Sequence, residues 1–185
     1  DHVDLVTSDV SKITKGGVTD DQGEEHLVDA IIYATGFHAH KFMWPMEIVG
    51  ASGVTLEDTW NDDARAYMGM TTPDFPNMFF LYGPNTGLGH GGSLIFHVEC
   101  QTRYLAQCLM RTLEAGKRKI EVKPEINTAY NQRVDDEHER MVWTHTGVTN
   151  WYKNSQGRVV SNSPWRLVDY WHMTHSPDMS DYKLS

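Results

Sequence analysis

The chain has 185 residues, of which 39% are apolar and 22% are charged, a composition that suits an ordinary globular domain and argues against disorder. Its formal net charge of -9 argues against a nucleic acid partner, because phosphate binding needs a basic face and the only dense basic run is Lys117-Arg118-Lys119. Because the sequence contains neither a signal peptide nor an apolar run of about 18 residues, we expect no membrane segment and a cytoplasmic location.

The first residues, Asp1-His2-Val3, do not include an initiating methionine, and we expect the chain to be a fragment of a longer protein. Short apolar runs from Val3 to Val28 are separated by turn clusters at Gly16-Gly17 and at residues 20–23, which predicts a small antiparallel β-meander. The continuous apolar centre of the next segment, Asp29–Phe37, predicts a strand that is buried on both faces, as in a parallel sheet.

Residues 38–72 show little periodicity, and their aromatic and methionine side chains lie among Pro, Gly, Asp and Asn. This pattern predicts a long, well-packed excursion with short helical turns. Such side chains are typical either of a pocket lining or of plain packing. We favour packing, because methionine fills irregular gaps anywhere.

The apolar run 78–82 predicts a strand, the glycine-rich segment Gly83–Gly92 predicts a turn, and the apolar positions from Leu94 to Leu113 predict a helix that Ser93 caps and Gly116 ends. Turns of this kind are where α/β proteins hold phosphates or polar cofactor edges, because unpaired N–H groups and the positive end of the helix dipole converge there. A cofactor site at this turn is therefore the first hypothesis.

Later segments predict further local structure. Ile120-Glu121-Val122 is expected to be extended, and Pro124 is expected to open a second helix. Residues 154–157 predict a turn between strand pieces, and residues 175–178 predict a surface tail. One face of the second helix is expected to carry Ile126, Tyr130, Val134, His138 and Met141.

Gly87-x-Gly89-x-x-Gly92 formally satisfies the dinucleotide fingerprint G-x-G-x-x-G between a predicted strand and a predicted helix. No matching acid follows roughly 20 residues later, and the leading Gly-Pro-Asn is foreign to that fingerprint. We therefore favour a loop that approaches another part of a cofactor over a loop that binds the pyrophosphate.

Other kinds of chemistry receive less support. The ten histidines show neither H-E-x-x-H nor a cysteine-paired spacing, so no metal is expected. His90 lies in the glycine turn and is expected either to face a ligand or to cap the turn. No G-x-S-x-G elbow is present. Cys100 and Cys108 lie about 12 Å apart along the predicted helix, which excludes a disulfide between them and suits a reducing compartment.

Asp29–Phe37 resembles the D-x-x-x-x-A-T-G-[FY] segment of the class B flavoprotein monooxygenases, the flavin-containing and Baeyer-Villiger enzymes. Three later features agree in order: residues 75–79 (F-P-N-M-F), Gly83-Pro84-Asn85, and Trp151-Tyr152 with Gly157-Arg158. The pattern spans nearly the whole chain and is similar to the 4-hydroxyacetophenone-type branch. The family's C-x-S-W-Y element is reduced here to its aromatic pair.

The resemblance implies an α/β fold, the C-terminal part of a flavoprotein with two dinucleotide-binding domains for FAD and NAD(P), preceded by the β-meander. Residues 1–37 would end the NADPH-binding domain, and residues 38–185 would belong to the FAD-binding domain. The family's two dinucleotide fingerprints and its active-site arginine are expected upstream. No catalytic residue is therefore expected in this chain, and the fragment alone is expected to be inactive.

The implied cofactors are FAD and NADPH, and the implied partners are a ketone, O2 and the rest of the parent chain. In this family NADPH reduces FAD, and O2 is captured as a C4a-peroxyflavin that attacks the ketone. The amides of Asn85, Thr86, Gly87 and Leu88 are expected to face the flavin's pyrimidine edge. The Asn85 side chain would either bind the flavin or fix the turn. The other expected cofactor-binding residues are Asp29, Ala34, Thr35, Gly36 and His90.

Two alternatives to a Baeyer-Villiger enzyme stay open. The first is a flavin monooxygenase that hydroxylates nitrogen or sulfur and shares the same Ala-Thr-Gly segment. The second is a non-catalytic interaction module that keeps the fold without the cofactor. Neither the substrate nor the oligomeric state is indicated by the sequence.

Overall fold

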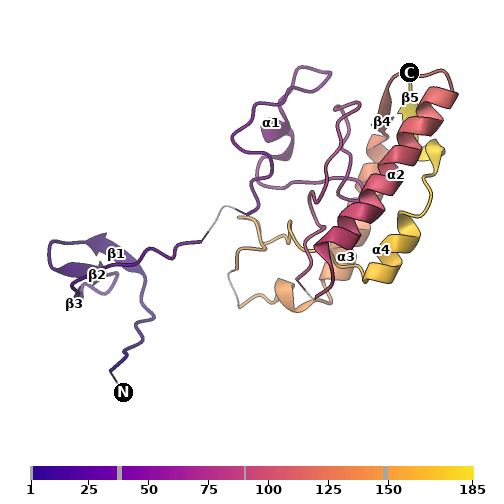
Figure 1. The fold of residues 1–185 in the computed structure, drawn as a ribbon. Helices are drawn as coiled ribbons and strands as arrows, with labels where there is room; N and C mark the ends of the chain where they lie inside the picture. Colours follow the sequence, from indigo (N-terminus) through magenta and orange to yellow (C-terminus); the bar gives the residue numbers. More distant parts are fainter. Residues whose placement is uncertain (1, 37–38, 90, 148–149) are drawn as a thin grey trace. The chain divides into compact units, whose positions relative to one another are not determined.

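The computed structural model describes residues 2–36, 39–89, 91–147 and 150–185 (Figure 1). The chain divides into two compact units, residues 1–36 and residues 37–185. Each unit is described by itself.

The first unit contains three short strands, β1 (Val10–Ile13), β2 (Gly17–Asp20) and β3 (Glu25–Leu27). They pair antiparallel in the order β1-β2-β3. Glycine is required at the start of β2, because a Cβ on Gly17 would lie 2.0 Å from the His26 carbonyl oxygen.

Asp20 holds the turn between β2 and β3. Its Oδ1 accepts hydrogen bonds from the backbone N–H groups of Gln22 and Glu24, and its Oδ2 accepts one from the Ser8 hydroxyl. These bonds, the Ser8 hydroxyl foremost, lower the pKa of Asp20 to about 2. Potential metal-ligand atoms of Asp20, Glu24 and His26 lie within 4.8 Å of one another. Both Asp20 oxygens already accept hydrogen bonds, so we interpret the cluster as one that stabilises the turn.

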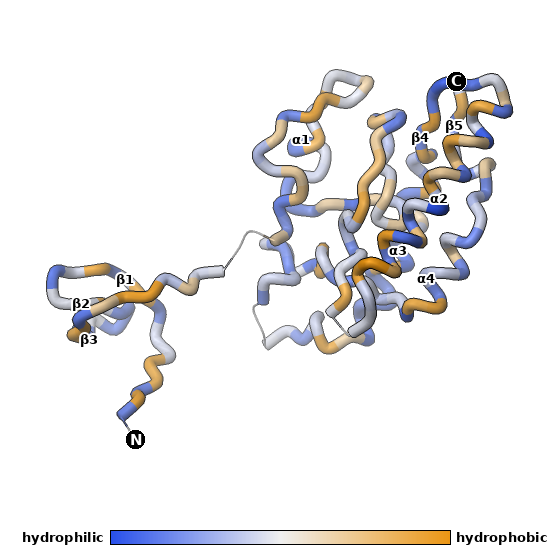
Figure 2. Tube along the Cα trace, in the orientation of Figure 1, coloured by the Kyte–Doolittle hydropathy of each residue, from blue (hydrophilic) through white to orange (hydrophobic). Residues whose placement is uncertain are grey.

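The prediction of a buried strand over Asp29–Phe37 is wrong for the described residues 29–36, which belong to no strand. Ile32 is 90% exposed and Tyr33 is 69% exposed. A strand buried on both faces needs neighbouring strands at its edges and other layers over its faces, and no strand of the part of the chain described by the structure pairs with this segment. Its apolar residues are marked orange in Figure 2.

The second unit contains four helices and a two-stranded sheet within its described residues (Figure 1). Strand β4 pairs antiparallel with β5 at the end of the chain, with Ile120 opposite Leu184. The sequence predicted the first of these strands and missed the second. The elements are α1 (Leu56–Trp60), α2 (Leu94–Glu114), β4 (Ile120–Val122), α3 (Pro124–His138), α4 (Leu167–Met173) and β5 (Tyr182–Leu184), with short 3-10 turns at Val142–Thr144 and Met179–Asp181.

The two long predicted helices are confirmed. The Ser93 side chain caps α2 by accepting a hydrogen bond from the Phe96 N–H at 3.2 Å, and Gly116 follows the helix with a φ of 68°. Helix α3 begins at Pro124 as predicted and buries Tyr130, Val134 and His138, whereas Met141 lies beyond its end.

The predicted strand over residues 78–82 is absent. Asn77 and Tyr82 have φ values of 61° and 57°, in the left-handed region that no strand contains. The segment is instead held by single hydrogen bonds, such as that from the Phe80 N–H to the Met70 carbonyl oxygen at 2.8 Å.

A main core cluster joins α2, α3, β4 and β5 to residues of the 38–72 excursion. Cys100 and Cys108 lie in it as free buried thiols, as predicted, and burial raises the pKa of Cys108 to about 11. Its fully buried members include Met70, Tyr104, Cys108, Val122, Val134 and Tyr170.

A second cluster joins the excursion to the segment that follows it and comprises Leu56, Trp60, Ala64, Ala66, Phe75 and Phe80. Plain packing is therefore the role of some of the apolar side chains in the excursion. Trp44 and Met46 are more than half exposed and line a cavity of about 310 Å³, so a pocket lining accounts for another part.

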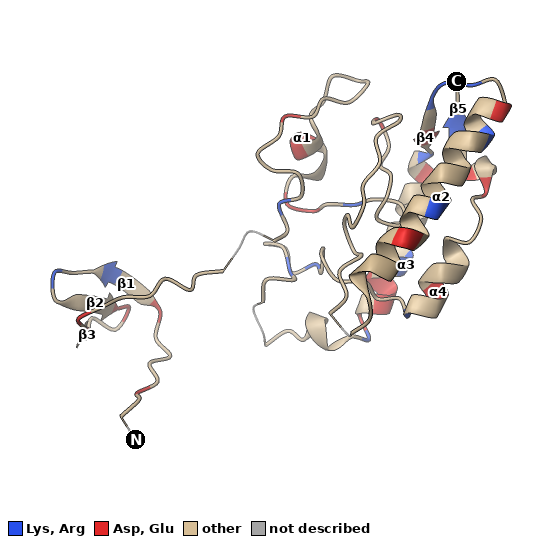
Figure 3. Ribbon diagram, in the orientation of Figure 1, with Lys and Arg blue, Asp and Glu red and all other residues tan. Residues whose placement is uncertain are grey.

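No helix within the described ranges is long and apolar enough to cross a membrane. Figure 3 shows basic and acidic residues interspersed along the ribbon of each of the two units. The basic run Lys117-Arg118-Lys119 follows the end of α2, where positive charge is favourable to the helix dipole.

Candidate functional site

The glycine turn is held against a distant loop, residues 158–163, which we call the C-terminal loop. The Asn85 N–H donates to the Val160 carbonyl oxygen at 2.9 Å, and the Gly87 N–H donates to the Ser161 carbonyl oxygen at 2.8 Å. Gly87 and Asn162 form a parallel bridge. Two segments more than 70 residues apart thus build one structure, which no local pattern predicted.

The Asn85 side chain fixes this turn. It is 2% exposed, and its Nδ2 donates to the carbonyl oxygens of Val159 at 2.8 Å and Asn162 at 3.2 Å. Its Oδ1 accepts from Arg158 Nη2 at 3.1 Å. The sequence left two roles open for the Asn85 side chain, binding the flavin or fixing the turn. In this structure its polar atoms fix the turn.

The expectation of unpaired amides along this turn needs correction. The N–H groups of Asn85 and Gly87 are engaged by the C-terminal loop, and the Leu88 N–H donates to the Tyr82 hydroxyl at 3.2 Å. Thr86 is fully buried, and its hydroxyl donates to the Gly83 carbonyl oxygen. The long-range pairing, invisible in the local sequence, explains the difference.

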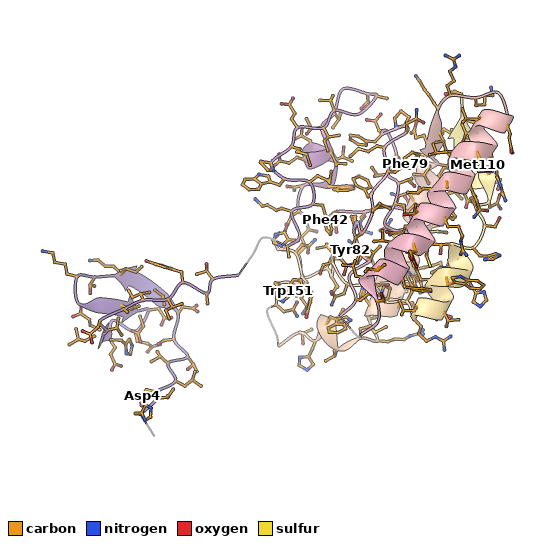
Figure 4. All side chains as sticks on the ribbon, viewed as in Figure 1. Asp4, Phe42, Phe79, Tyr82, Met110 and Trp151 are labelled. Carbon is orange, nitrogen blue, oxygen red and sulfur yellow. The ribbon has the colours of Figure 1, made fainter. Side chains whose placement is uncertain are left out.

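An aromatic cavity of about 480 Å³ lies beside the turn. Figure 4 labels Phe42, Tyr82 and Trp151, which reach it from three separate segments. Its lining is Ala39, Phe42, Tyr82, Gly83, Gly87, Leu88, Gly89, Trp151, Tyr152, Ser161 and Asn162.

The structure brings some of the predicted site residues to this cavity and leaves others elsewhere. Gly87 and Leu88 line it, while Asn85 and Thr86 support the turn without lining it. The segment containing Asp29, Ala34, Thr35 and Gly36 belongs to the first unit, where it is exposed. His90 lies outside the described residues. Binding of a cofactor by any of these residues stays a prediction.

Asn162 was missed by the sequence analysis. It is 2% exposed and lines the cavity, and its Nδ2 has no hydrogen-bond partner among the residues that the structure describes. A Cβ at Gly89 would lie 2.7 Å from this nitrogen and 3.1 Å from Trp143 Cη2. Glycine at position 89 therefore lets the turn approach the amide closely, and a side chain there would clash with it.

An ion-pair network anchors the C-terminal loop. Arg158 is 11% exposed, and its Nε and Nη1 donate to Asp135 at 2.7 Å and Asp63 at 3.1 Å. Arg65 pairs with the same two carboxylates, at 2.9 and 2.7 Å. Since Arg158 also holds Asn85, the network connects the excursion, α3 and the glycine turn. The Gly157-Arg158 motif was the only sequence signal for it.

His138, at the end of α3, supports the same loop. Its Nε2 lies 3.0 Å from the Asn162 carbonyl oxygen, and burial lowers the pKa of the imidazole below its ordinary value of 6.5. The folded state therefore holds His138 neutral over a pH range in which the unfolded chain binds a proton.

We expect stability to be complete above pH 6.5 and to fall as the pH drops below that value, because the unfolded state then takes up a proton that folded His138 does not. Urea unfolding at a series of pH values measures this, with His138→Phe as the comparison. Parallel curves for the two proteins over this range would contradict the expectation.

Comparisons with known proteins find monooxygenases among the relatives of this chain. No protein-family model matches it. An FAD-binding monooxygenase of Aspergillus niger is 41% identical over 174 residues, which are 91% of this chain and 28% of that protein. A Baeyer-Villiger monooxygenase of Pseudomonas aeruginosa is 35% identical over 182 residues, 98% of this chain and 34% of that protein. The chain spans about a third of the length of these curated relatives.

Solved structures share the fold of the chain. The crystal structure of OTEMO in complex with FAD and NADP aligns with a TM-score of 0.79 at 20% identity and covers 99% of this chain and 34% of that one. The closed form of a cyclohexanone monooxygenase aligns with a TM-score of 0.74 at 22% identity, over 95% of this chain and 34% of that one.

Proposed function

We propose that this chain is a C-terminal portion of a Baeyer-Villiger-type flavoprotein monooxygenase and helps to form its FAD site, and that the complete enzyme uses NADPH and O2 to insert oxygen into ketones. One observation carries the proposal. The Gly83-Pro84-Asn85 turn and the Trp151-Tyr152 pair, two of the four motifs that resemble the family, meet at one aromatic cavity. The division of the chain after residue 36 supports a first part that ends the NADPH-binding domain and a second that belongs to the FAD-binding domain.

The cavity has the chemistry that a flavin ring requires. Aromatic side chains supply flat apolar walls, Gly89 lines one side without a side chain, and the buried Asn162 amide supplies a donor without a protein partner among the described residues. FAD, when bound and reduced by NADPH, would supply the activation of O2.

The chain's own residues would hold and shield that group. Gly87 and Leu88 would contact the ring at its polar edge, while Tyr82 and Trp151 would exclude water from it. Asp29, Ala34, Thr35 and Gly36 are proposed to contact a cofactor in the complete protein, where their exposed segment would meet the remainder of the parent chain.

The test is to purify the full-length protein and record its visible flavin absorbance, then to follow ketone-dependent NADPH oxidation and analyse the product. An ester or lactone is expected. A hydroxylated amine or a sulfoxide as the sole product would replace the ketone proposal with nitrogen or sulfur oxidation. A folded full-length protein without flavin would refute the cofactor site and favour an interaction module.

The isolated chain is expected to show no ketone-dependent NADPH oxidation, because G-x-G-x-x-G occurs in it only once and in a form unsuited to pyrophosphate. Oxidation of NADPH at the full-length rate by the isolated chain would contradict this expectation.

A further inference from the structure

Asn162 divides its polar groups between two tasks. Its backbone carbonyl oxygen accepts hydrogen bonds from Asn85 Nδ2 at 3.2 Å and from His138 Nε2 at 3.0 Å, so the backbone holds the turn. Its side chain adds little to this, since its only recorded contact within the described residues is a long one of 3.5 Å from the Ser161 hydroxyl to Oδ1. The side chain can therefore be changed while the structural contacts remain.

The Nδ2 of Asn162 is a buried donor without a partner among the described residues. Such groups destabilise a fold, and each one in a native structure calls for an explanation. Asn162 lines the aromatic cavity, and its nitrogen lies next to the position that Gly89 keeps empty of a side chain. The donor thus has a reason to bind a ligand, and the cavity that its residue lines has the volume for one.

The lining of the cavity determines which ligand atom suits this donor. None of its described lining residues carries a charge, so the cavity offers no counter-ion to a phosphate or a carboxylate. Trp151 and Tyr152 instead present rings 4.1 Å apart. A volume of about 480 Å³ lies in the range of small-molecule sites and far exceeds a single water. A neutral, flat ligand with a hydrogen-bond acceptor fits these properties.

We propose that the Asn162 side-chain amide donates a hydrogen bond to a carbonyl oxygen of the ligand in the aromatic cavity. The carbonyl belongs either to the flavin ring or to the ketone, which offer the same acceptor chemistry. This inference rests on the proposed function, because it takes the cavity to be part of the FAD site. It assigns a ligand contact to a residue outside the motifs that resemble the family.

The experiment uses the full-length protein with Asn162→Leu, which keeps the approximate size of the side chain and removes the donor. If the ketone is the acceptor, KM for the ketone rises about tenfold while kcat and the flavin spectrum change little. If the flavin is the acceptor, the FAD dissociation constant rises about tenfold and the flavin absorbance shifts before any ketone is added.

Two further variants make the test decisive. Asn162→Asp retains a polar side chain of the same shape and directs negative charge at the carbonyl, so its effect should exceed that of Asn162→Leu in the same measurement. Asn127→Leu makes the same exchange on α3, outside the cavity lining, and should change neither KM nor the spectrum.

Failure of this inference is distinct from failure of the proposed function. A wild-type protein that binds flavin, together with Asn162 variants whose KM, FAD affinity and spectrum all equal those of the wild type, would overturn the Asn162 contact alone. A folded wild-type protein without flavin would overturn the proposed function and the contact with it.

Discussion

Replacing Arg158 with methionine should lower the free energy of unfolding by about 3 kcal/mol. Methionine keeps much of the apolar stem of arginine. It removes the N–H groups that donate hydrogen bonds to Asp63, Asp135 and Asn85. Arg65 can still neutralise part of the carboxylate charge, whereas the buried Asn85 oxygen is left without its partner. Urea unfolding of the variant and the wild type measures the difference.

Arg166→Met is the matched control. Arg166 also donates two hydrogen bonds to one carboxylate, that of Asp169, but its side chain is 79% exposed, so its loss should change stability little. Similar small effects from both substitutions would show that the Arg158 network adds no more than a surface ion pair.

The same Arg158→Met substitution should weaken FAD binding by the full-length protein, because Arg158 holds the side chain that fixes the glycine turn. Arg158→Lys should recover only part of the lost FAD affinity. Lysine retains the positive charge, but it lacks the planar guanidinium that donates to several acceptors at once.

Replacing Gly69 with alanine is expected to destabilise the protein by about 3 kcal/mol. Gly69 has a φ of 69°, and a Cβ there would lie 2.1 Å from Thr86 Cγ2 and 2.8 Å from the Pro84 carbonyl oxygen. Thr86 is fully buried in the glycine turn, so the clash cannot be relieved by movement into solvent. The change should also disturb the proposed flavin site. Thermal or urea unfolding measures the cost.

Gly116→Ala separates the clash from the backbone strain. Gly116 has a φ of 68°, almost the same as Gly69, but a Cβ there would meet nothing within 4 Å. Its substitution should cost about 1 kcal/mol, the strain of a left-handed alanine alone. Equal costs at the two positions would mean that the turn around Thr86 moves freely.

Both long helices could be predicted because their determinants are local. Apolar spacing, the Ser93 cap and the glycine at position 116 define α2 within one segment, and Pro124 with its periodic face defines α3. The order of the family-like motifs was equally a property of the sequence alone, and it agrees with the monooxygenase relatives of the chain.

The predicted strands failed for a physical reason. An apolar run such as residues 29–36 or 78–82 becomes a strand only when other strands accept its hydrogen bonds, and those partners are not specified within the run. In this structure the first segment is exposed, and the second begins after one left-handed residue, Asn77, and ends at another, Tyr82. Strand β5 was missed for the converse reason, because its pairing with β4 depends on residues more than 50 positions away.

The sequence by itself thus determined the helices, the absence of a disulfide and the family-like motifs, all of which follow from residues close together in the chain. The arrangement of the candidate site depends on the tertiary structure alone. The tertiary structure paired the glycine turn with the C-terminal loop, engaged the Asn85 and Gly87 amides that were expected to face a flavin, and placed the unpartnered Asn162 amide beside Gly89 within the described residues. These features arise from contacts across more than 70 residues, and local spacing does not encode such contacts.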